Sequence, residues 1–82
     1  MDNSMIIAVD FDGTCVEHDY PDVGLDVEGA VDTLKALVAK GHRLILFTMR
    51  SGKKLEAAER WFKEHKIELW ASNRNPEQEE WT

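Results

Sequence analysis

The stretch that decides the fold spans residues 5–14 and reads MIIAVDFDGT. Its first five residues are apolar without alternation, which is typical of a strand buried on both faces of a parallel sheet. Side chains alternate along an extended segment, so Asp10 and Asp12 are expected to point to one side and Phe11 to the other. The stretch therefore predicts two carboxylates at the carboxyl end of a buried strand, where open α/β sheets place their chemistry.

The rest of the chain predicts alternating helices and strands. A helix is expected from an N-cap at Asp26 to about Lys40, with Gly41 as its C-cap. An apolar strand follows at residues 43–47, then a helix at residues 53–65 and a short strand at residues 67–70, while residues 71–82 are predicted to be loop. The buried stripes of the two helices are expected at Ala30, Val31, Leu34, Leu37 and Val38, and at Leu55, Ala58, Trp61 and Phe62. This order predicts a parallel sheet with helices packed on it.

Length and composition limit the class of protein. The chain has 82 residues, enough for one small domain, and 43% of them are hydrophobic. No apolar run is long enough to span a membrane, and the first residues lack the basic start of a signal peptide. Cys15 is the only cysteine, so no internal disulfide can form. These features together favour a cytoplasmic protein that does not associate with membranes.

Charge is distributed unevenly along the chain. The formal net charge of -6 argues against non-specific binding of nucleic acid. Residues 1–39 hold nine acidic residues and one basic residue, whereas residues 40–66 hold eight basic and three acidic residues. An acidic first segment suits a divalent cation and a basic middle suits an anion, although solvated helix faces and loops would give the same distribution.

The polar residues at the two predicted strand ends suit phosphoryl transfer. The carboxylate of Asp10 can attack phosphorus and form an aspartyl-phosphate, provided that Mg²⁺ neutralises the phosphoryl oxygens. Asp12 can protonate the leaving oxygen and then deprotonate the attacking water. Gly13 lets the backbone turn so that amide N–H groups face the phosphate. Thr48 offers a hydroxyl and an N–H to a phosphate oxygen, and Arg50 can add a charge-assisted contact.

Each of these residues also has a plain structural interpretation. Two aspartates in a loop commonly cap helices or satisfy turns, and Thr48 alone would be a strand-end hydroxyl. Arg50 would usually belong to a solvated helix start. His18 has no partner at zinc-ligand spacing, and Cys15 is expected to pack rather than to react.

The combination of the two strand ends resembles the haloacid dehalogenase-like (HAD) superfamily. The sequence Asp-Phe-Asp-Gly-Thr at residues 10–14 matches the first motif of that family, and Phe47-Thr48 matches the second. The resemblance implies a Rossmann-like three-layer α/β sandwich with a parallel sheet. The loop after the first strand is too short for a folded cap domain, so the chain resembles a small capless member.

The resemblance also implies roles for residues. It makes Asp10 the nucleophile and Asp12 the general acid/base. Mg²⁺ would be held by the carboxylate of Asp10 and the backbone carbonyl of Asp12. Contacts to the phosphate are predicted at Phe11, Asp12, Thr48, Met49 and Arg50. The implied activity is that of a magnesium-dependent phosphatase acting on a phosphorylated substrate through an aspartyl-phosphate on Asp10.

Two parts of the family pattern are missing from this sequence. One is a lysine that steadies the phosphate, for which Lys53 or Lys54 could substitute, and the other is an acidic pair after a further strand. Glu77, Glu79 and Glu80 lie in polar surroundings that do not resemble such a strand.

Without the further strand, residues 5–9 would form an apolar sheet edge. The chain is then expected to be a fragment of a longer protein or to self-associate through this edge. The alternatives to an enzyme are a phosphate- or metal-binding module without turnover and a domain that keeps the phosphoryl group on Asp10.

Overall fold

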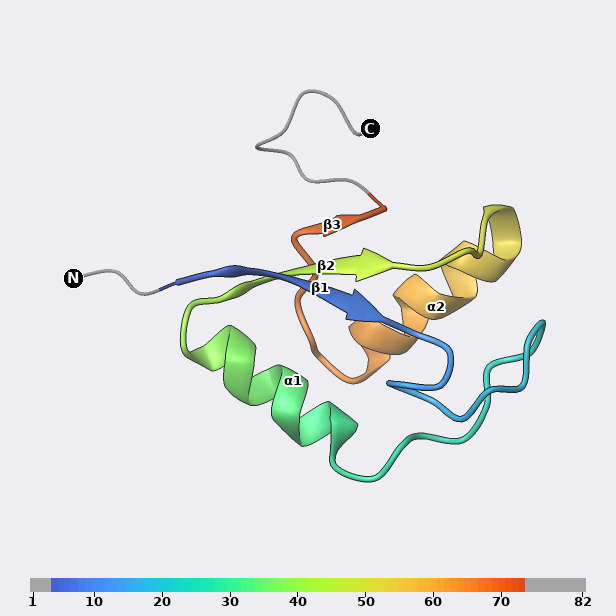
Figure 1. The fold of residues 1–82 in the computed structure, drawn as a ribbon, viewed down its shortest axis with the longest axis horizontal. Helices are drawn as coiled ribbons and strands as arrows, with labels where there is room; N and C mark the ends of the chain where they lie inside the picture. The colour runs from blue at the N-terminus through green and yellow to red at the C-terminus, as the bar shows by residue number, and fades with distance from the viewer. Residues whose placement is uncertain (1–3, 74–82) are drawn as a thin grey trace.

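The computed structural model describes residues 4–73, and its strands and helices alternate along the chain. They are β1 (Ile6–Asp10), α1 (Ala30–Ala39), β2 (Arg43–Phe47), α2 (Gly52–Glu64) and β3 (Ala71–Ser72) (Figure 1). The three strands form one parallel sheet in the order β1-β2-β3, and Asp10 is paired with Phe47. The predicted α/β class with a parallel β-α-β-α-β order is therefore confirmed. In residues 4–73 no helix is both long and apolar enough to cross a membrane.

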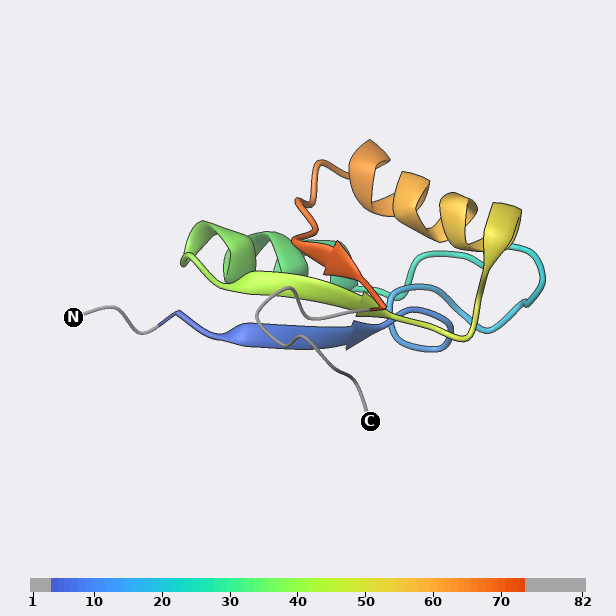
Figure 2. The same ribbon diagram turned by 90° about the horizontal axis from the view of Figure 1, so that it is seen from above.

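Both helices lie on the same face of the sheet (Figures 1 and 2). Alternate strand residues such as Val9 and Leu46 share one hydrophobic core with Leu34 of α1 and Phe62 of α2. This arrangement follows from two right-handed crossovers that advance in the same direction across the sheet. Residues 4–73 thus form two layers, and the third layer of the expected sandwich is not among them.

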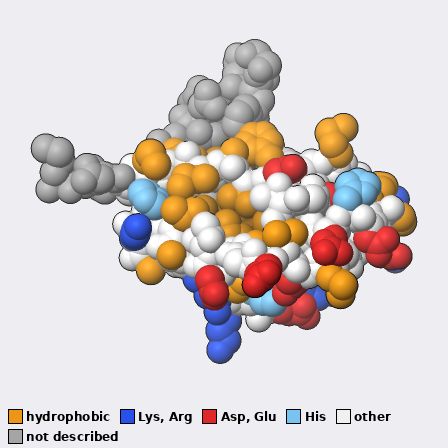
Figure 3. Space-filling model, turned by 60° about the horizontal axis from the view of Figure 1, so that its bottom comes forward, with side chains coloured by type: hydrophobic (Ala, Val, Ile, Leu, Met, Phe, Trp, Pro, Cys, Tyr) orange, Lys and Arg blue, Asp and Glu red, His pale blue; other side chains and the backbone are white. Residues whose placement is uncertain are grey.

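The burial of the two longer strands differs. Leu44, Ile45 and Leu46 of β2 are each at most 2% exposed, as predicted for a central strand. The prediction that residues 5–9 are buried on both faces is wrong, because Ala8 is exposed. Within residues 4–73, β1 pairs with β2 alone and the helices cover one face only. The space-filling view of Figure 3 shows hydrophobic side chains in the middle of the face that it presents, and acidic ones toward its right-hand end.

The ends of α1 confirm one predicted cap and correct the other. Gly41, with φ of 91°, lies just beyond the end of the helix. Its N–H donates to the carbonyl of Val38, and the N–H of His42 donates to the carbonyl of Leu37. These two bonds form a Schellman motif, as expected for a C-terminal glycine. The predicted N-cap at Asp26 is wrong, because Gly29 precedes α1. Asp26 instead accepts a hydrogen bond of 2.7 Å from Trp61 Nε1, which fixes the loop to α2.

The segment after α2 departs from the prediction. Lys66 has φ of 59°, and the N–H of Ile67 bonds the Phe62 carbonyl at 2.9 Å, so residues 65–67 close the helix with a second Schellman motif. Ile67 is 3% exposed because this motif turns it into the core. Residues 67–70 are therefore not a strand, and β3 lies at Ala71–Ser72, inside the predicted loop. Residues 74–82 of that loop lie outside the described part of the chain.

Candidate functional site

The predicted site residues meet at the carboxyl ends of β1 and β2. Because the two strands are parallel and paired, Asp10 and Thr48 emerge at the same edge of the sheet. A cavity of about 530 Å³ opens there, and it is lined by Asp10, Asp12, His18, Tyr20, Thr48, Met49 and Arg50. The sequence thus predicted five of these seven residues as site residues, whereas Phe11, the sixth predicted residue, does not line the cavity because its side chain is fully buried in the core.

The turn after β1 is held by its own backbone. The carbonyl of Phe11 accepts N–H groups from Thr14 at 3.1 Å and Cys15 at 2.9 Å. Gly13, with φ of 88°, donates its N–H to the Val16 carbonyl at 2.7 Å. The N–H groups of Gly13, Thr14 and Cys15 are therefore bonded within the loop and are not free to face a phosphate.

Phe11 and Cys15 anchor the turn in the core. Both side chains are fully buried, and the Phe11 ring meets the Trp61 ring edge-on at 5.7 Å between centroids. The Cys15 thiol donates to the backbone carbonyl of Asp10 at 3.3 Å. Burial raises the pKa of Cys15 to about 12, and the carboxylates of Asp10 and Asp12 add to this shift. Cys15 is therefore a packing residue, as predicted.

The two carboxylates of the site have different surroundings. Asp10 is exposed, and no described residue donates a hydrogen bond to its carboxylate. Asp12 is held by Arg50, whose Nε and Nη2 bond its two oxygens at 2.8 and 2.7 Å. The hydrogen bond from Arg50 lowers the pKa of Asp12, although burial acts in the opposite direction. Asp10 thus carries a carboxylate open to the cavity, while Asp12 is fixed in its ionised form.

Thr48 is fixed through both its backbone and its side chain. Its N–H donates to Asn73 Oδ1 at 2.9 Å, and its hydroxyl oxygen accepts the Arg50 N–H at 3.1 Å. The Thr48 N–H is thus already bonded, and the hydroxyl keeps its hydrogen to donate into the cavity. Asn73 was not predicted as a site residue, because its partner Thr48 lies 25 residues away in the sequence.

The loop between β1 and α1 supplies a wall that the sequence did not predict. His18 and Tyr20 line the cavity from this loop. The Tyr20 hydroxyl lies 3.3 Å from Lys54 Nζ, and the ammonium of Lys54 stands over the ring. Lys53 and Lys54, the suggested substitutes for the missing lysine, are not among the lining residues of this cavity.

The oxygen atoms at the site suit a hard cation in part. No cluster of three or more His, Cys, Asp or Glu side chains able to hold a metal occurs within residues 4–73. Mg²⁺ usually binds one or two carboxylates and keeps several waters, so it does not require such a cluster. The open carboxylate of Asp10 fits this manner of binding.

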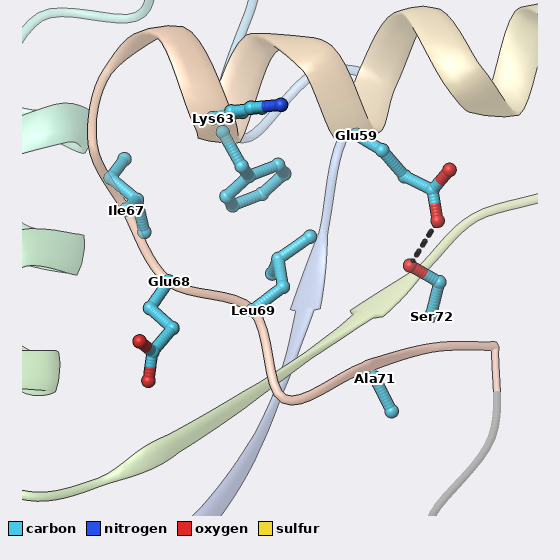
Figure 4. A pocket seen from close by; sticks show the side chains of 8 residues that line it. Glu59, Lys63, Ile67, Glu68, Leu69, Ala71 and Ser72 are labelled. Atoms are coloured by element: carbon cyan, nitrogen blue, oxygen red, sulfur yellow. Dashed lines mark hydrogen bonds between the residues drawn. The ribbon is translucent and has the colours of Figure 1, made fainter.

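A larger hollow lies away from these residues. It measures about 570 Å³ and is formed by α2 and the segment that leads into β3 (Figure 4). Its lining includes Phe62, Ile67 and Leu69, and a hydrogen bond of 2.7 Å joins Ser72 Oγ to Glu59 at its rim. None of the predicted site residues lines this hollow, so the smaller cavity at the strand ends is the candidate site.

Comparison with known proteins gave one informative similarity. No family model and no curated protein matches this chain. A solved structure of a conserved protein coded by a locus from Bacteroides thetaiotaomicron is 47% identical in sequence, with a TM-score of 0.88. The match covers 94% of this chain and 64% of that one. The chain is thus similar in fold and sequence to that protein, and it spans less than two thirds of its length.

Proposed function

We propose that this chain carries the site of a magnesium-dependent phosphohydrolase of the HAD type, which acts through an aspartyl-phosphate. The observation that carries the proposal is the pairing of an open carboxylate with a fixed one. Asp10 is exposed at the end of β1, while Asp12 lines the same cavity and is held by Arg50 at 2.7 and 2.8 Å. Two carboxylates with unlike surroundings can take the separate roles of nucleophile and proton carrier.

In the proposed first step, an oxygen of the Asp10 carboxylate forms a bond to phosphorus while the bond from phosphorus to the leaving oxygen breaks. Asp12, ionised in the resting site, takes a proton from the singly ionised phosphate ester and delivers it to that leaving oxygen. In the second step, water attacks the phosphorus of the aspartyl-phosphate, Asp12 takes the water proton, and orthophosphate leaves with the Asp10 carboxylate restored. The ion pair with Arg50 favours the ionised form of Asp12, which is the form that the second step needs.

The hydroxyl of Thr48 is suited to bind a phosphate oxygen. The hydroxyl oxygen accepts the backbone N–H of Arg50 at 3.1 Å, so the hydroxyl hydrogen is free to donate. Mg²⁺, held by the Asp10 carboxylate and the Asp12 carbonyl, would neutralise charge on the phosphoryl oxygens when bound. The exposed side chain of Met49 lies at the mouth of the cavity, where it can meet the organic part of a substrate.

The finer fold assignment belongs to the same proposal. The β-α-β-α-β order, the parallel register of β1 with β2 and the Asp-Phe-Asp-Gly-Thr turn support a Rossmann-like fold of the HAD type. The match covers 64% of the Bacteroides protein, so an activity that needs the whole length of such a protein is likewise only proposed here.

Hydrolysis of p-nitrophenyl phosphate with and without Mg²⁺ tests the proposal. The parent should release p-nitrophenol only with Mg²⁺, and Asp10→Asn should release none. Asp12→Asn should turn over about 10²-fold more slowly, since a general acid or base contributes 10²–10⁴-fold, and should accumulate a phosphoryl group on Asp10. Arg60→Lys, on the outer face of α2, is the matched control and should match the parent.

Other outcomes separate the alternatives. Phosphoryl transfer to Asp10 without release of orthophosphate would favour a phospho-acceptor domain. Equal activity in the parent and Asp10→Asn would contradict the proposed nucleophile.

A further inference from the structure

Arg50 is a buried arginine whose donors are all in use. Its side chain is fully buried, and a guanidinium carries five N–H groups. Two of these N–H groups bond the Asp12 carboxylate at 2.7 and 2.8 Å. The other three bond the backbone carbonyls of Pro21 at 3.2 Å, Asp22 at 2.7 Å and Lys54 at 3.3 Å. A phosphate oxygen could bond Arg50 only if one of these five bonds broke.

The partners of Arg50 come from three separate parts of the chain. Asp12 belongs to the turn after β1, Pro21 and Asp22 to the following loop, and Lys54 to the first turn of α2. The guanidinium also stands 5.2 Å from the ring centroid of Phe11 and 5.2 Å from that of Tyr20. Arg50 therefore joins the turn, the loop and the helix at a single point.

This geometry fixes the carboxylate of Asp12 in direction as well as in place. A bidentate contact holds a carboxylate in the plane of the guanidinium, whereas a single bond would leave it free to rotate. The same guanidinium holds the segment at Pro21 and Asp22, next to Tyr20 in the cavity wall. The orientation of Asp12 and the position of the wall are thus linked.

We propose that Arg50 is a positioning residue of this site, which orients Asp12 and holds the loop beside it and does not bind phosphate. The role rests on the proposed function, because Asp12 is the group whose orientation matters there. It also revises the expectation that Arg50 contacts the phosphate.

The test introduces Arg50→Lys into the parent and into Asp12→Asn. Lysine keeps the positive charge but cannot make the bidentate contact of a guanidinium. With p-nitrophenyl phosphate and Mg²⁺, Arg50→Lys should lower kcat by about 10²-fold, the lower end of the range for a general acid or base. Its Kd for beryllium fluoride, an analogue of the phosphoryl group on aspartate, should stay within about twofold of the parent in calorimetric titration. Asp12→Asn combined with Arg50→Lys should be no slower than Asp12→Asn alone, because effects that act through one residue do not add.

A direct phosphate ligand would behave differently. Arg50→Lys would then weaken beryllium fluoride binding tenfold or more, or would slow Asp12→Asn by the same factor as the parent. Either result would overturn the positioning role. Arg60→Lys, an exposed arginine on α2, should change neither kcat nor Kd.

A measurement on the unmodified chain covers the case in which Arg50→Lys does not fold. The NMR signal of the Arg50 Nε–H should be protected from solvent exchange and should keep its chemical shift when Mg²⁺ and beryllium fluoride are added. A large shift, or loss of protection, on addition would show that Arg50 changes partners to meet the phosphoryl group. A parent chain that binds no beryllium fluoride would overturn the proposed function and this role together, whereas binding with a shifted Arg50 signal would overturn this role alone.

Discussion

The side-chain oxygen of Asn73 accepts the backbone N–H of Thr48 at 2.9 Å. Asn73 follows β3, and its own N–H donates to the Leu46 carbonyl at 2.7 Å. The side-chain oxygen thereby takes the place of a main-chain carbonyl. It adds one hydrogen bond to the ladder between β2 and β3, beyond the end of β3. The hydrogen bond from Ser72 to Glu59 ties the same short strand to α2, so Thr48 is held by a supported partner.

Replacing Asn73 should therefore weaken phosphate binding. Asn73 has φ of 53°, a conformation that glycine adopts without strain, so Asn73→Gly removes the acceptor without forcing the backbone to move. We expect the affinity for orthophosphate with Mg²⁺ to fall about threefold to tenfold, because Thr48 would then be ordered only on binding, and the bond that orders it contributes about 1 kcal/mol. Calorimetric titration measures this. Lys66→Gly is the control, because it also replaces a residue with positive φ but lies after the C-terminal end of α2 and does not line the cavity. Unchanged affinity in Asn73→Gly would contradict the role.

The pair of Asp12 and Arg50 should make stability depend on pH in the acid range. The hydrogen bond from Arg50 holds the pKa of Asp12 below its ordinary value of 3.8, with burial partly opposing it. Because the pKa of Asp12 is lower in the folded chain than in the unfolded chain, the pair stabilises the fold at any pH above the unfolded-state pKa. This stabilisation is lost as the pH falls from about 4 through the folded-state pKa. Urea unfolding between about pH 5 and pH 3 should show a smaller loss of free energy in Asp12→Asn than in the parent. Parallel pH profiles for the two chains would argue against the pair.

Two helix ends offer a matched test of backbone strain. Lys66 after α2 and Gly41 after α1 occupy equivalent positions with φ of 59° and 91°. Lys66→Gly should raise the free energy of unfolding by about 0.5–1 kcal/mol, because relief of the left-handed conformation outweighs the added freedom of the unfolded chain. Gly41→Ala should lower it by about 1 kcal/mol for the converse reason. Urea unfolding checks both, and a destabilised Lys66→Gly would contradict this account of the end of α2.

The contact between Asp26 and Trp61 should anchor the loop to α2. Trp61 is 5% exposed, and its Nε1–H donates to Asp26 at 2.7 Å. Asp26→Ala would leave this donor unsatisfied and should cost about 1–3 kcal/mol of unfolding free energy. Asp26→Asn keeps an oxygen acceptor and loses only the partly exposed pair with His65 at 3.2 Å, so it should cost less than about 1 kcal/mol. Equal losses in the two variants, by urea unfolding, would show that the hydrogen bond to Trp61 is not the anchor.

The parts of the fold that follow from local pattern could be predicted from the sequence. The bounds of β2 were predicted correctly, because its apolar run stands between Gly41 and polar residues. The C-terminal cap of α1 was also predicted, since glycine is favoured there. The strand expected at residues 67–70 was wrong, because the apolar Ile67 is buried by the Schellman motif after α2 rather than by a sheet.

The contacts that build the candidate site could be predicted only in part. Asp10, Asp12 and Thr48 could be predicted because they stand at the ends of apolar strands, and parallel pairing brings strand ends together. The bond from Arg50 to Asp12 spans 38 residues, and that from Thr48 to Asn73 spans 25. No local pattern indicates such pairs, because they depend on how the loop and β3 return to the sheet. The incorrect prediction that Asp26 caps α1 has the same cause, because its actual partner, Trp61, is distant in the sequence.

The central claim is that Asp10 is the open carboxylate at which a phosphoryl group binds together with Mg²⁺. Thermal unfolding with Mg²⁺, with beryllium fluoride and with both tests it without a known substrate. A ligand at one hundred times its Kd stabilises a fold by about 2.7 kcal/mol, which corresponds to roughly 10 °C or more for a domain of this size. We predict a shift of this order that needs both additives and disappears in Asp10→Asn. No shift in the parent, or an equal shift in Asp10→Asn, would contradict the account.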